Sequence, residues 1–496
     1  MAKQDFDVLI IGAGLSGIGA GCHLLKECPG KTFAILEGRS SIGGTWDLFR
    51  YPGIRSDSDM YTLGYEFRPW RDKKAIADGP SILSYIRETA NEHGIDEKIR
   101  YNHRVEKMEW SSQEALWSVT VSLGDGATKV LRSRFVISCT GYYRYEKGYM
   151  PEFPGLSKFG GQVIHPQQWP EDLDYSGKRI VVIGSGATAV TLVPSLAKKA
   201  KVTMLQRSPS YIIAAPEVDK LARKIEKFLP SMLAYQFTRV KNVSLQFLFY
   251  QFCRHYPEAA KKLIRQHLRS ILGKDFDIDT HFTPSYDPWD QRLCLVPNAD
   301  LFKVLRKGEA EIVTDHIDTF TKEGIRLKSG RVIEADIVVS ATGLDLVALG
   351  GSDITVDGRQ VKPSDTMSYK GLMLSGIPNF TMVMGYTNAS WTLKADLALR
   401  YACRLIQHVD RNGYDYCVPE VTSDVKEAPF LDLDANYVLR AIDKLPKQGD
   451  RAPWKVNQNY PLDILNLRLG SIKDRAMHFY HAGQMHGHGL DLAAAN

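Results

Sequence analysis

An apolar run of four residues, Val8–Ile11, leads into a glycine-rich stretch and then into a segment of small and apolar residues. Short continuous apolar runs are typical of strands buried in a parallel sheet, and the segment from Ile18 to about Lys26 predicts a helix. A second apolar run, TFAILE, ends at Glu37. The hydrophobic pattern therefore predicts a strand–helix–strand unit at the start of the chain.

The turn of this unit holds Gly12, Gly14 and Gly17 in the order G-x-G-x-x-G. Glycines there allow a tight turn and let the backbone approach a pyrophosphate, whose negative charge the helix N-terminus stabilises. Glu37 follows Gly17 by twenty residues and can accept hydrogen bonds from ribose hydroxyls. Strand, glycines, helix, strand and acid in this order predict a site for a dinucleotide with free ribose hydroxyls, such as FAD or NAD.

The same pattern returns in KRIVVIGSGATAV, with Gly184, Gly186 and Ala189 at the fingerprint positions. The next strand, KVTMLQ, ends without an acid and leads into Arg207 and Ser208. A carboxylate at this place would repel a 2′-phosphate, whereas a guanidinium can bind it. We therefore predict that the second site binds NADP; the alternative is that Arg207 is a solvated surface arginine.

Two further apolar runs, FVISCTG (135–141) and IVVSATG (337–343), both end in Thr-Gly. We expect these strands to return the chain to the nucleotide domains, where glycine lets it turn away near a cofactor. Two dinucleotide sites in one chain indicate electron transfer between them, most simply NADPH reducing a tightly held flavin.

Charge is unevenly distributed along the 496 residues, a length that suggests two to three domains. The net charge of +6 is modest and indicates no nucleic-acid partner, but Lys220–Lys274 has twelve Lys or Arg residues and two acids, a local +10. Phe, Leu, Tyr and Met alternate with these cations. The segment predicts either a helix with a basic and an apolar face at a membrane surface, or a helix pair whose apolar face is core and whose charges are solvated.

The number and spacing of the cysteines limit which metal, disulfide and redox sites the chain can form. The seven cysteines are scattered and form no C-x-x-C pair, so we expect neither a metal site nor a disulfide framework, and a reducing cytoplasm fits. No cysteine lies between Glu37 and Trp70, which excludes a flavin disulfide reductase. The N-terminus has no apolar signal core, and Gly184, Gly186 and Pro194 interrupt the uncharged run Ile180–Ala197, so no transmembrane helix is expected.

The connector FGGQVIHPQQWP (159–170) precedes the second fingerprint, and its prolines hold the residues before them extended. With Phe159, Gly161, His165 and Trp169 it matches the motif F-x-G-x-x-x-H-x-x-x-W-P/D. The chain thereby resembles class B flavoprotein monooxygenases, specifically Baeyer–Villiger monooxygenases. The related N- and S-oxygenating flavin monooxygenases usually end this motif without tryptophan. Two further stretches are similar to the mycobacterial ethionamide-activating monooxygenases: GGTWDLFRYPGIRSDSDMY (43–61) and DPWDQRLCLVPNADLF (287–302).

The resemblance implies an α/β fold with two Rossmann-like dinucleotide-binding domains and an inserted helical segment. An FAD domain is expected in two parts and an NADP domain in two parts, with the helical segment between the latter. The expected boundaries are 1–141 for the first part of the FAD domain, 142–210 for the connector and first NADP part, 211–287 for the helical segment, 288–341 for the second NADP part, and 342–496 for the second FAD part and C-terminal region.

The resemblance also assigns roles to residues. Arg292 is the expected catalytic cation, and Asp57 is the carboxylate that positions it. Gln291 stands where relatives often have a lysine that helps to bind the 2′-phosphate, so NADPH preference should depend mainly on Arg207. His165 and Trp169 are expected to couple the domains; alternatively they fill a seam between loop and domain. Cofactor contacts are expected from Gly12, Gly14, Gly17, Glu37, Gly44, Thr45, Trp46, Asp57, Gly184, Ser185, Gly186, Thr188, Arg207, Ser208 and Gln291.

The activity that the resemblance implies is oxidation of ketones to esters or lactones by NADPH and O2 through a flavin peroxide, with sulfoxidation of thioethers or thioamides as a second activity. The alternatives are an N- or S-oxygenating flavin monooxygenase and a redox-sensing module that holds FAD and NADPH without turnover. The expected partners are O2 and a small ketone or sulfide, and the location is cytoplasmic, with a peripheral membrane contact through Lys220–Lys274 as one alternative. The physiological substrate and the oligomeric state do not follow from the sequence.

Overall fold

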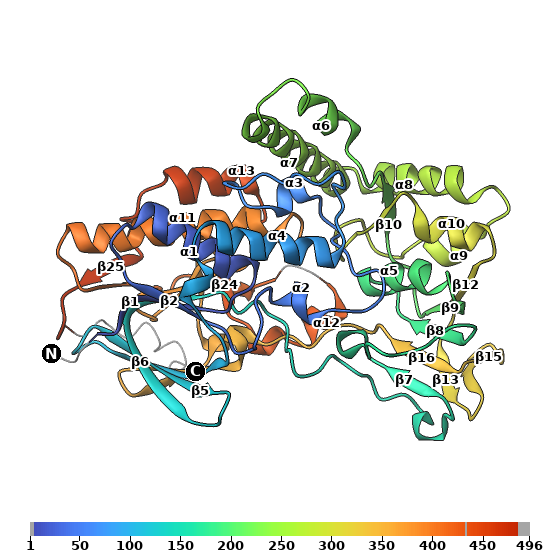
Figure 1. The fold of residues 1–496 in the computed structure, drawn as a ribbon, viewed down its shortest axis with the longest axis horizontal. Helices are drawn as coiled ribbons and strands as arrows, with labels where there is room; N and C mark the ends of the chain where they lie inside the picture. Colours follow the sequence, from blue (N-terminus) through green and yellow to red (C-terminus); the bar gives the residue numbers. More distant parts are fainter. Residues whose placement is uncertain (1–3, 432–433, 485–496) are drawn as a thin grey trace.

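In the computed structural model, two sheets lie side by side along the long axis of the molecule, and helices cover them (Figure 1). The structure describes residues 4–431 and 434–484. Residues 1–3, 432–433 and 485–496 of the expected 1–141 and 342–496 segments lie outside the described residues. We refer to the part built on the larger sheet as the first domain and to the part built on the smaller parallel sheet as the second domain.

The first domain contains a nine-stranded sheet with β1 (Phe6–Ile11), β2 (Phe33–Leu36), β3 (Ile99–Arg100), β4 (His103–Ser111), β5 (Leu116–Leu123), β6 (Thr128–Ser138), β17 (Asp353–Val356), β18 (Arg359–Val361) and β21 (Phe380–Met382). The order is β18-β17-β4-β5-β6-β1-β2-β3, and β21 also pairs with β6. β1 pairs in parallel with β2 and β6, whereas β4, β5 and β6 are antiparallel. Val8, Leu9 and Ile10 are fully buried because β1 is central and covered on both faces.

Helices pack on one side of this sheet (Figure 1). They are α1 (Leu15–Glu27), α4 (Gly79–Glu92) and α11 (Trp391–Arg411). α4 begins where the side chain of Asp78 accepts a hydrogen bond from the Ser81 amide at 2.9 Å, with proline in its first turn. The short helices α2 (Thr45–Leu48) and α3 (Met60–Leu63) lie in the loop between β2 and α4.

The second domain contains a five-stranded parallel sheet with β7 (Gln162–Ile164), β8 (Arg179–Ile183), β9 (Lys201–Gln206), β12 (Ala310–Thr314) and β16 (Ile337–Ser340), in the order β12-β9-β8-β16-β7. The helices α5 (Ala187–Leu196) and α10 (Asp300–Arg306) share one core cluster on this sheet. Its other face packs against the antiparallel strands β13 (Ile317–Phe320), β14 (Gly324–Leu327) and β15 (Val332–Glu334). The chain thus leaves the first sheet after β6, and β17 is the next strand to return to it.

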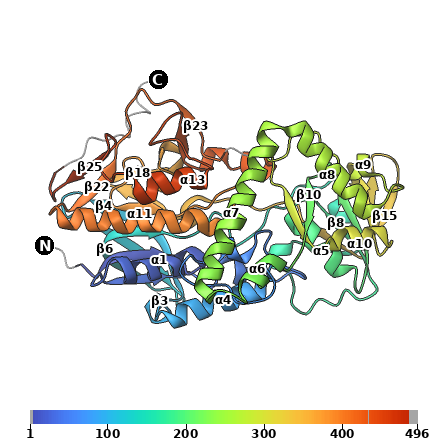
Figure 2. The same ribbon diagram turned by 90° about the horizontal axis from the view of Figure 1, so that it is seen from above.

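The expected helical segment 211–287 contains α6 (Lys220–Ile225), α7 (Ser231–His255), α8 (Pro257–Leu272) and α9 (Ile278–Phe282). It also begins with a strand, β10 (Ile212–Ala215), which pairs in parallel with β11 (Cys294–Pro297). α7 lies near the boundary between the two domains (Figure 2): Arg239 in its first half contacts the first domain, and Arg254 near its end pairs with Asp290 of the second. Among the described residues, no helix combines the length and the hydropathy that a membrane span needs.

The chain after β21 completes the first domain. Besides α11 this part of the chain contributes β22 (Tyr416–Pro419), β23 (Glu427–Pro429), α12 (Asn436–Leu439), β24 (Lys447–Gly449), α13 (Tyr460–Asp463) and β25 (Met477–Tyr480). The segment just before β21 forms a short strand pair of its own, β19 (Ser368–Tyr369) with β20 (Met373–Leu374). β22 pairs with β25 and β23 with β24, both antiparallel. Residues of this region close the second face of the nine-stranded sheet.

Candidate functional site

A cavity of 1330 Å³ lies between the two domains, at the carboxyl ends of β1 and β8. Both glycine fingerprints line it, through Gly12 and Gly14 on one side and Gly184 and Gly186 on the other. Parallel sheets place their ligands at this edge, because the loops that leave the strands there can diverge around a ligand. The two predicted nucleotide sites are therefore parts of one cavity.

Two glycines of the first fingerprint have no room for a side chain. A Cβ on Gly12, whose φ is +99°, would come within 2.7 Å of the Cys139 carbonyl oxygen, and one on Gly17 within 1.8 Å of the Gly12 carbonyl oxygen. A Cβ on Gly14 would lie 3.6 Å from the Cα of Gly44. The turn and the start of α1 consequently expose bare backbone to the cavity, which fits a pyrophosphate.

Glu37 lies at the end of β2 with its carboxylate in the cavity wall. Its Oε2 accepts a hydrogen bond from the Ala13 amide at 2.8 Å, and its Oε1 accepts one from the Arg39 amide at 2.9 Å. Burial raises the pKa of Glu37, while these two donors favour the charged form. Each oxygen keeps a lone pair that can accept a ribose hydroxyl. Thr45 and Trp46 of α2 line the same side.

The second fingerprint is built in the same way. Gly184 has a φ of +139°, and a Cβ there would lie 2.4 Å from the Ala341 carbonyl oxygen, whereas the space beside Gly186 is open. Thr188 stands in the first turn of α5 and lines the cavity, and the hydroxyl of Ser185 is 2.7 Å from that of Ser210. These groups could hold a second pyrophosphate at the N-terminus of α5.

Arg207 and Ser208 follow β9 directly, and both are exposed at the cavity wall. Gln206, the residue before them, is buried and donates hydrogen bonds to the His281 carbonyl and the Thr314 hydroxyl, both at 2.8 Å. Gln206 therefore fixes the end of β9 rather than contacting a ligand. A guanidinium at this position can reach a 2′-phosphate.

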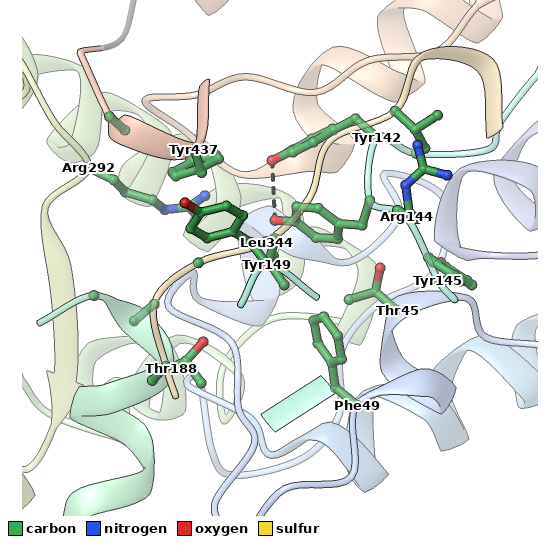
Figure 3. A pocket seen from close by; sticks show the side chains of 18 of the residues that line it. Thr45, Phe49, Tyr142, Arg144, Tyr145, Tyr149, Thr188, Arg292, Leu344 and Tyr437 are labelled. Atoms are coloured by element: carbon green, nitrogen blue, oxygen red, sulfur yellow. Dashed lines mark hydrogen bonds between the residues drawn. The ribbon is translucent and has the colours of Figure 1, made fainter. Parts of the chain in front are cut away.

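Arg292 and Asp57 form an ion pair across the domain boundary. Nη2 of Arg292 is 2.8 Å from Oδ2 of Asp57 and 3.0 Å from its Oδ1. Asp57 precedes α3 in the first domain, and Arg292 precedes β11 in the second. The side chain of Arg292 is 35% exposed, and it points into the cavity (Figure 3). The negative charge of Asp57 raises the pKa of Arg292 further, so the guanidinium stays charged.

The turn that carries Arg292 is held from its outer side. Oδ2 of Asp290 accepts a hydrogen bond from the Asp287 amide at 3.0 Å, and its Oδ1 accepts one from Nη1 of Arg254, on α7, at 2.6 Å. Gln291 also lines the cavity, beside Arg292. The helical segment thus helps to position the predicted catalytic turn.

Four tyrosines around Arg292 were not among the predicted site residues: Tyr142, Tyr143, Tyr149 and Tyr437 (Figure 3). The hydroxyls of Tyr142 and Tyr143 are 3.3 Å apart. Burial raises the pKa of Tyr143 to about 12 and raises those of Tyr142 and Tyr437 as well, so all three are neutral at neutral pH. The string YYRYEKGY directly after FVISCTG signals the first three, whereas nothing in the local sequence marks Tyr437.

The connector motif lies outside the cavity lining. A Cβ on Gly161 would lie 2.4 Å from the Asp336 carbonyl oxygen, so glycine is required there. The ring of Phe159 packs against Phe320, with centroids 5.8 Å apart, and Trp169 meets Tyr175 edge-on at 6.2 Å. Phe159, Gly161 and Trp169 therefore hold the connector on the second domain.

His165 contacts the segment where the chain returns to the first domain. Its Nδ1 accepts a hydrogen bond from the Gln167 amide at 3.2 Å, so its Nε2 carries the proton and donates to the Gly343 carbonyl at 3.2 Å. Burial lowers the pKa of His165, which keeps the ring neutral. The outgoing and returning segments are themselves joined, by a bridge between Tyr143 and Leu346 and by an ion pair between Arg144 and Asp345 at 2.7 Å.

Comparison with known proteins agrees with this geometry. The protein-family model described as flavin-binding monooxygenase-like matches residues 67–240. A second family model, for an NAD(P)-binding Rossmann-like domain, matches residues 10–71. Among solved structures, an oxidized steroid monooxygenase bound to NADP is similar with a TM-score of 0.74, at 21% identity over 96% of this chain and 99% of that one. A closed cyclohexanone monooxygenase has a TM-score of 0.68, at 23% identity over 84% and 87%. These structures share the fold.

Closer relatives are found among curated sequences. The FAD-containing monooxygenase EthA of Mycobacterium tuberculosis is 53% identical over 479 residues, which cover 96% of this chain and 98% of the relative. EthA of Mycolicibacterium smegmatis is 52% identical over 96% of this chain and 97% of its own length. Identity of this extent covers both domains, the helical segment and the cavity between them. The chain therefore belongs to the family of FAD-containing monooxygenases that includes EthA.

Proposed function

We propose that this protein catalyses the NADPH- and O2-dependent Baeyer–Villiger oxidation of ketones to esters or lactones. The observation that carries the proposal is the Arg292–Asp57 pair, with Nη2 and Oδ2 2.8 Å apart, in a cavity that both nucleotide cradles share. Cyclohexanone and steroid monooxygenases among the solved structures of this fold support the same chemistry.

The two cradles suit two different cofactors. The first domain fits FAD, because Gly12, Gly14 and Gly44 present bare backbone and Glu37 offers free lone pairs to a ribose. The second domain fits NADPH, because Arg207 lines the cavity directly after β9, a position from which an arginine can bind a 2′-phosphate. When bound, FAD would supply the activation of O2 and the transfer of one oxygen atom, with electrons from NADPH. We propose the first domain as the FAD domain and the second as the NADP domain.

Arg292 and the tyrosines define what the chain itself contributes. The guanidinium is a fixed positive charge in a partly closed cavity, where it stabilises negative charge that develops on oxygen and can donate to a ketone carbonyl. Asp57 fixes its orientation. The rings of Tyr142, Tyr143 and Tyr437 occupy the cavity wall around it and displace water, which strengthens the electrostatic effect. Because these phenols stay neutral, they add no charge that competes with Arg292.

The same geometry favours neutral substrates over amines. An amine reacts through the lone pair of its neutral form, so it must first lose a proton at neutral pH, and the Arg292 cation repels the protonated form. Ketones and thioethers have no such requirement. We therefore propose ketone oxidation and sulfoxidation ahead of N-oxygenation.

The connector and the cysteines support two lesser proposals. The contact of His165 with Gly343 suggests that the connector couples movement of the second domain to the chain crossing, with Phe159 and Trp169 fixing it to that domain. All seven cysteines are free and buried, which suits a reducing cytoplasm.

Product analysis tests the main proposal. Purified holoenzyme is incubated with NADPH, O2 and a panel of a cyclic ketone, a thioether and a tertiary amine, and the products are identified by mass spectrometry. Lactone formation with one oxygen atom from ¹⁸O2 is expected. N-oxide as the sole oxygenated product, or NADPH oxidation that no substrate stimulates, would refute it.

A further inference from the structure

Helix α7 is docked with its polar face inward. Its buried residues include Tyr235, Thr238 and Arg239, and Nη1 of Arg239 donates hydrogen bonds to the Tyr61 carbonyl at 2.9 Å and the Gly64 carbonyl at 2.8 Å. These contacts satisfy the buried charge, and the ring of Tyr235 packs against Tyr61 in the core of the first domain, with centroids 6.0 Å apart. The helix is therefore held on the first domain by hydrogen bonds and by one buried tyrosine.

The next two turns of α7 continue these polar contacts. Asn242 donates a hydrogen bond to Oδ1 of Asp59 at 2.9 Å, and Gln246 donates one to Oδ2 of the same carboxylate at 2.8 Å. Because Asp59 also caps α3, this face of α7 is committed to the first domain. Most of the large apolar residues of α7 other than Tyr235 lie away from this face.

They lie on the outside. Leu233, Phe237, Val240 and Leu248 are 58%, 59%, 65% and 61% exposed, and their spacing places them along one side of the helix. Phe228, in the turn before α7, is 84% exposed. We call these five residues the apolar ridge. α6 and α7 stand out from the body of the molecule (Figure 1), so the ridge is accessible to a large flat partner.

Helix α8 shows that this arrangement is not general to the helical segment. It buries Ala260, Ile264, Leu268 and Leu272, and its exposed positions include Lys262, Arg265 and Arg269. α8 therefore has the apolar core face of the second alternative, but several of its cations are in ion pairs, among them Lys261 with Asp287 at 2.7 Å and Arg265 with Asp279. α7 buries Ala234, Tyr235 and Cys253, but its apolar ridge is not core, and several large apolar side chains in line are rare on a surface that faces only water.

The charges beside the ridge indicate its partner. Lys220, Lys224 and Lys227 are exposed on and just after α6, next to Phe228. The acids of this region are already in ion pairs: Asp219 with Lys241 at 2.6 Å, and Glu226 with Arg223. Lysines next to exposed aromatic and aliphatic side chains, with neighbouring acids neutralised, complement anionic lipid headgroups above an acyl layer.

We propose that the apolar ridge docks the enzyme on an anionic lipid bilayer, with α7 lying in the interface and the α6 lysines among the headgroups. The ridge residues are apolar and the α6 lysines lie beside them, so affinity depends on both insertion and charge. None of the ridge residues lines the cavity, so docking is separate from the chemistry.

Flotation of the holoenzyme with vesicles tests this docking. Vesicles of phosphatidylcholine with phosphatidylglycerol should carry the protein, and pure phosphatidylcholine vesicles should carry less. F237Q/V240Q should lower the vesicle partition coefficient by roughly tenfold or more, because two apolar side chains no longer leave water. K224Q/K227Q should lower it by roughly fivefold per lysine, and only for anionic vesicles. L263Q changes a leucine on α8 that is 51% exposed, and it should have no effect.

NADPH oxidation in vesicle-free buffer shows that each variant is folded, and it should be unchanged in all three. The proposal is overturned if the native holoenzyme stays unbound to anionic vesicles at low salt, or if F237Q/V240Q floats as well as L263Q. It is also overturned if light scattering finds a lipid-free dimer that F237Q/V240Q dissociates while neither protein binds vesicles, since the ridge would then contact a second copy.

Discussion

Replacing Arg292 by alanine should separate electron transfer from oxygen transfer. The variant loses the positive charge whose Nη2 contacts both oxygens of Asp57, at 2.8 and 3.0 Å, but it keeps both nucleotide cradles. It should still bind FAD and NADPH, because neither fingerprint changes. It should form little ester and release the reduced oxygen as hydrogen peroxide.

The expected size of this loss follows from the position of the charge. A unit charge about 4 Å from a developing anion is worth roughly 4 kcal/mol at an effective dielectric constant of about 20. The side chain of Arg292 is 35% exposed to the cavity, and this screening reduces its contribution. Losing one hydrogen-bond donor to a developing oxyanion in other enzymes costs about 2.7–4 kcal/mol, and we take the lower end, a loss of about 10²-fold in oxygenation.

Two assays on the same reaction measure this separation: chromatography of the ester, and a peroxidase-coupled assay for hydrogen peroxide. Asp57→Ala should lose less, about tenfold, because it removes one charge-assisted contact and leaves the cation. Arg254→Ala is the matched control, since it removes the ion pair with Asp290 on the outer side of the same turn. A normal ester yield from Arg292→Ala would refute the reasoning, and an equal loss in Arg254→Ala would assign the effect to the shape of the turn.

Three further predictions test other parts of the structure. Arg207→Ala should raise the KM for NADPH by roughly 10- to 100-fold and leave the KM for NADH unchanged. The control Arg331→Ala, at another exposed arginine of the second domain, should change neither KM. Equal weakening of both coenzymes by Arg207→Ala would show that Arg207 has a structural role. The purified protein should release FAD and not FMN on denaturation, and Glu37→Ala should lower FAD occupancy because the Ala13 and Arg39 amides lose their acceptor; a fully loaded variant by absorbance would contradict this. Burial alone would lower the pKa of His23, but its hydrogen bonds to Asp396 and Glu27 raise it from 6.5 to about 9. The protonated ring therefore stabilises the folded state fully below about pH 6.5, and this stabilisation is lost as the pH rises through about 9. His23→Gln should lower the Tm more at pH 6.5 than at pH 9.5, and equal shifts at both pH values would contradict the pairing.

Much of the first domain follows from local sequence patterns. The predicted strand Val8–Ile11 lies within β1. The sequence predicts the helix from Ile18, but α1 already begins at Leu15, so that Gly17 lies inside it. The helix can begin there because the Cβ that Gly17 lacks would meet the Gly12 carbonyl oxygen. Such units are predictable because each depends on contacts between residues that are close in sequence.

The parts that could not be predicted depend on distant segments. Tyr437 reaches the cavity from α12, and no local pattern connects it with Arg292. The composition of α7 indicates two unlike faces but not which one is buried. That choice depends on Asp59 and the carbonyls near Tyr61, far away in sequence, which offer polar partners where an apolar seam was one expectation. The segment 211–287 likewise includes β10 because β11 supplies its partner from outside that range.

The adjacent chain crossings at Tyr143 and Leu346 also bear on how the molecule folds. β6 ends at Ser138 and its parallel neighbour β21 begins at Phe380, with the whole second domain between them. Joining strands so far apart through a flexible loop would carry a large entropy cost. Once the inserted domain has folded, its two ends are held together by the Tyr143–Leu346 bridge and the Arg144–Asp345 ion pair, so the chain that separates β21 from β6 is effectively reduced to the residues after Leu346, which include β17 and β18. The inserted domain can therefore fold first and, by holding its two ends together, lower the entropy cost of pairing the strands of the first sheet on either side of it.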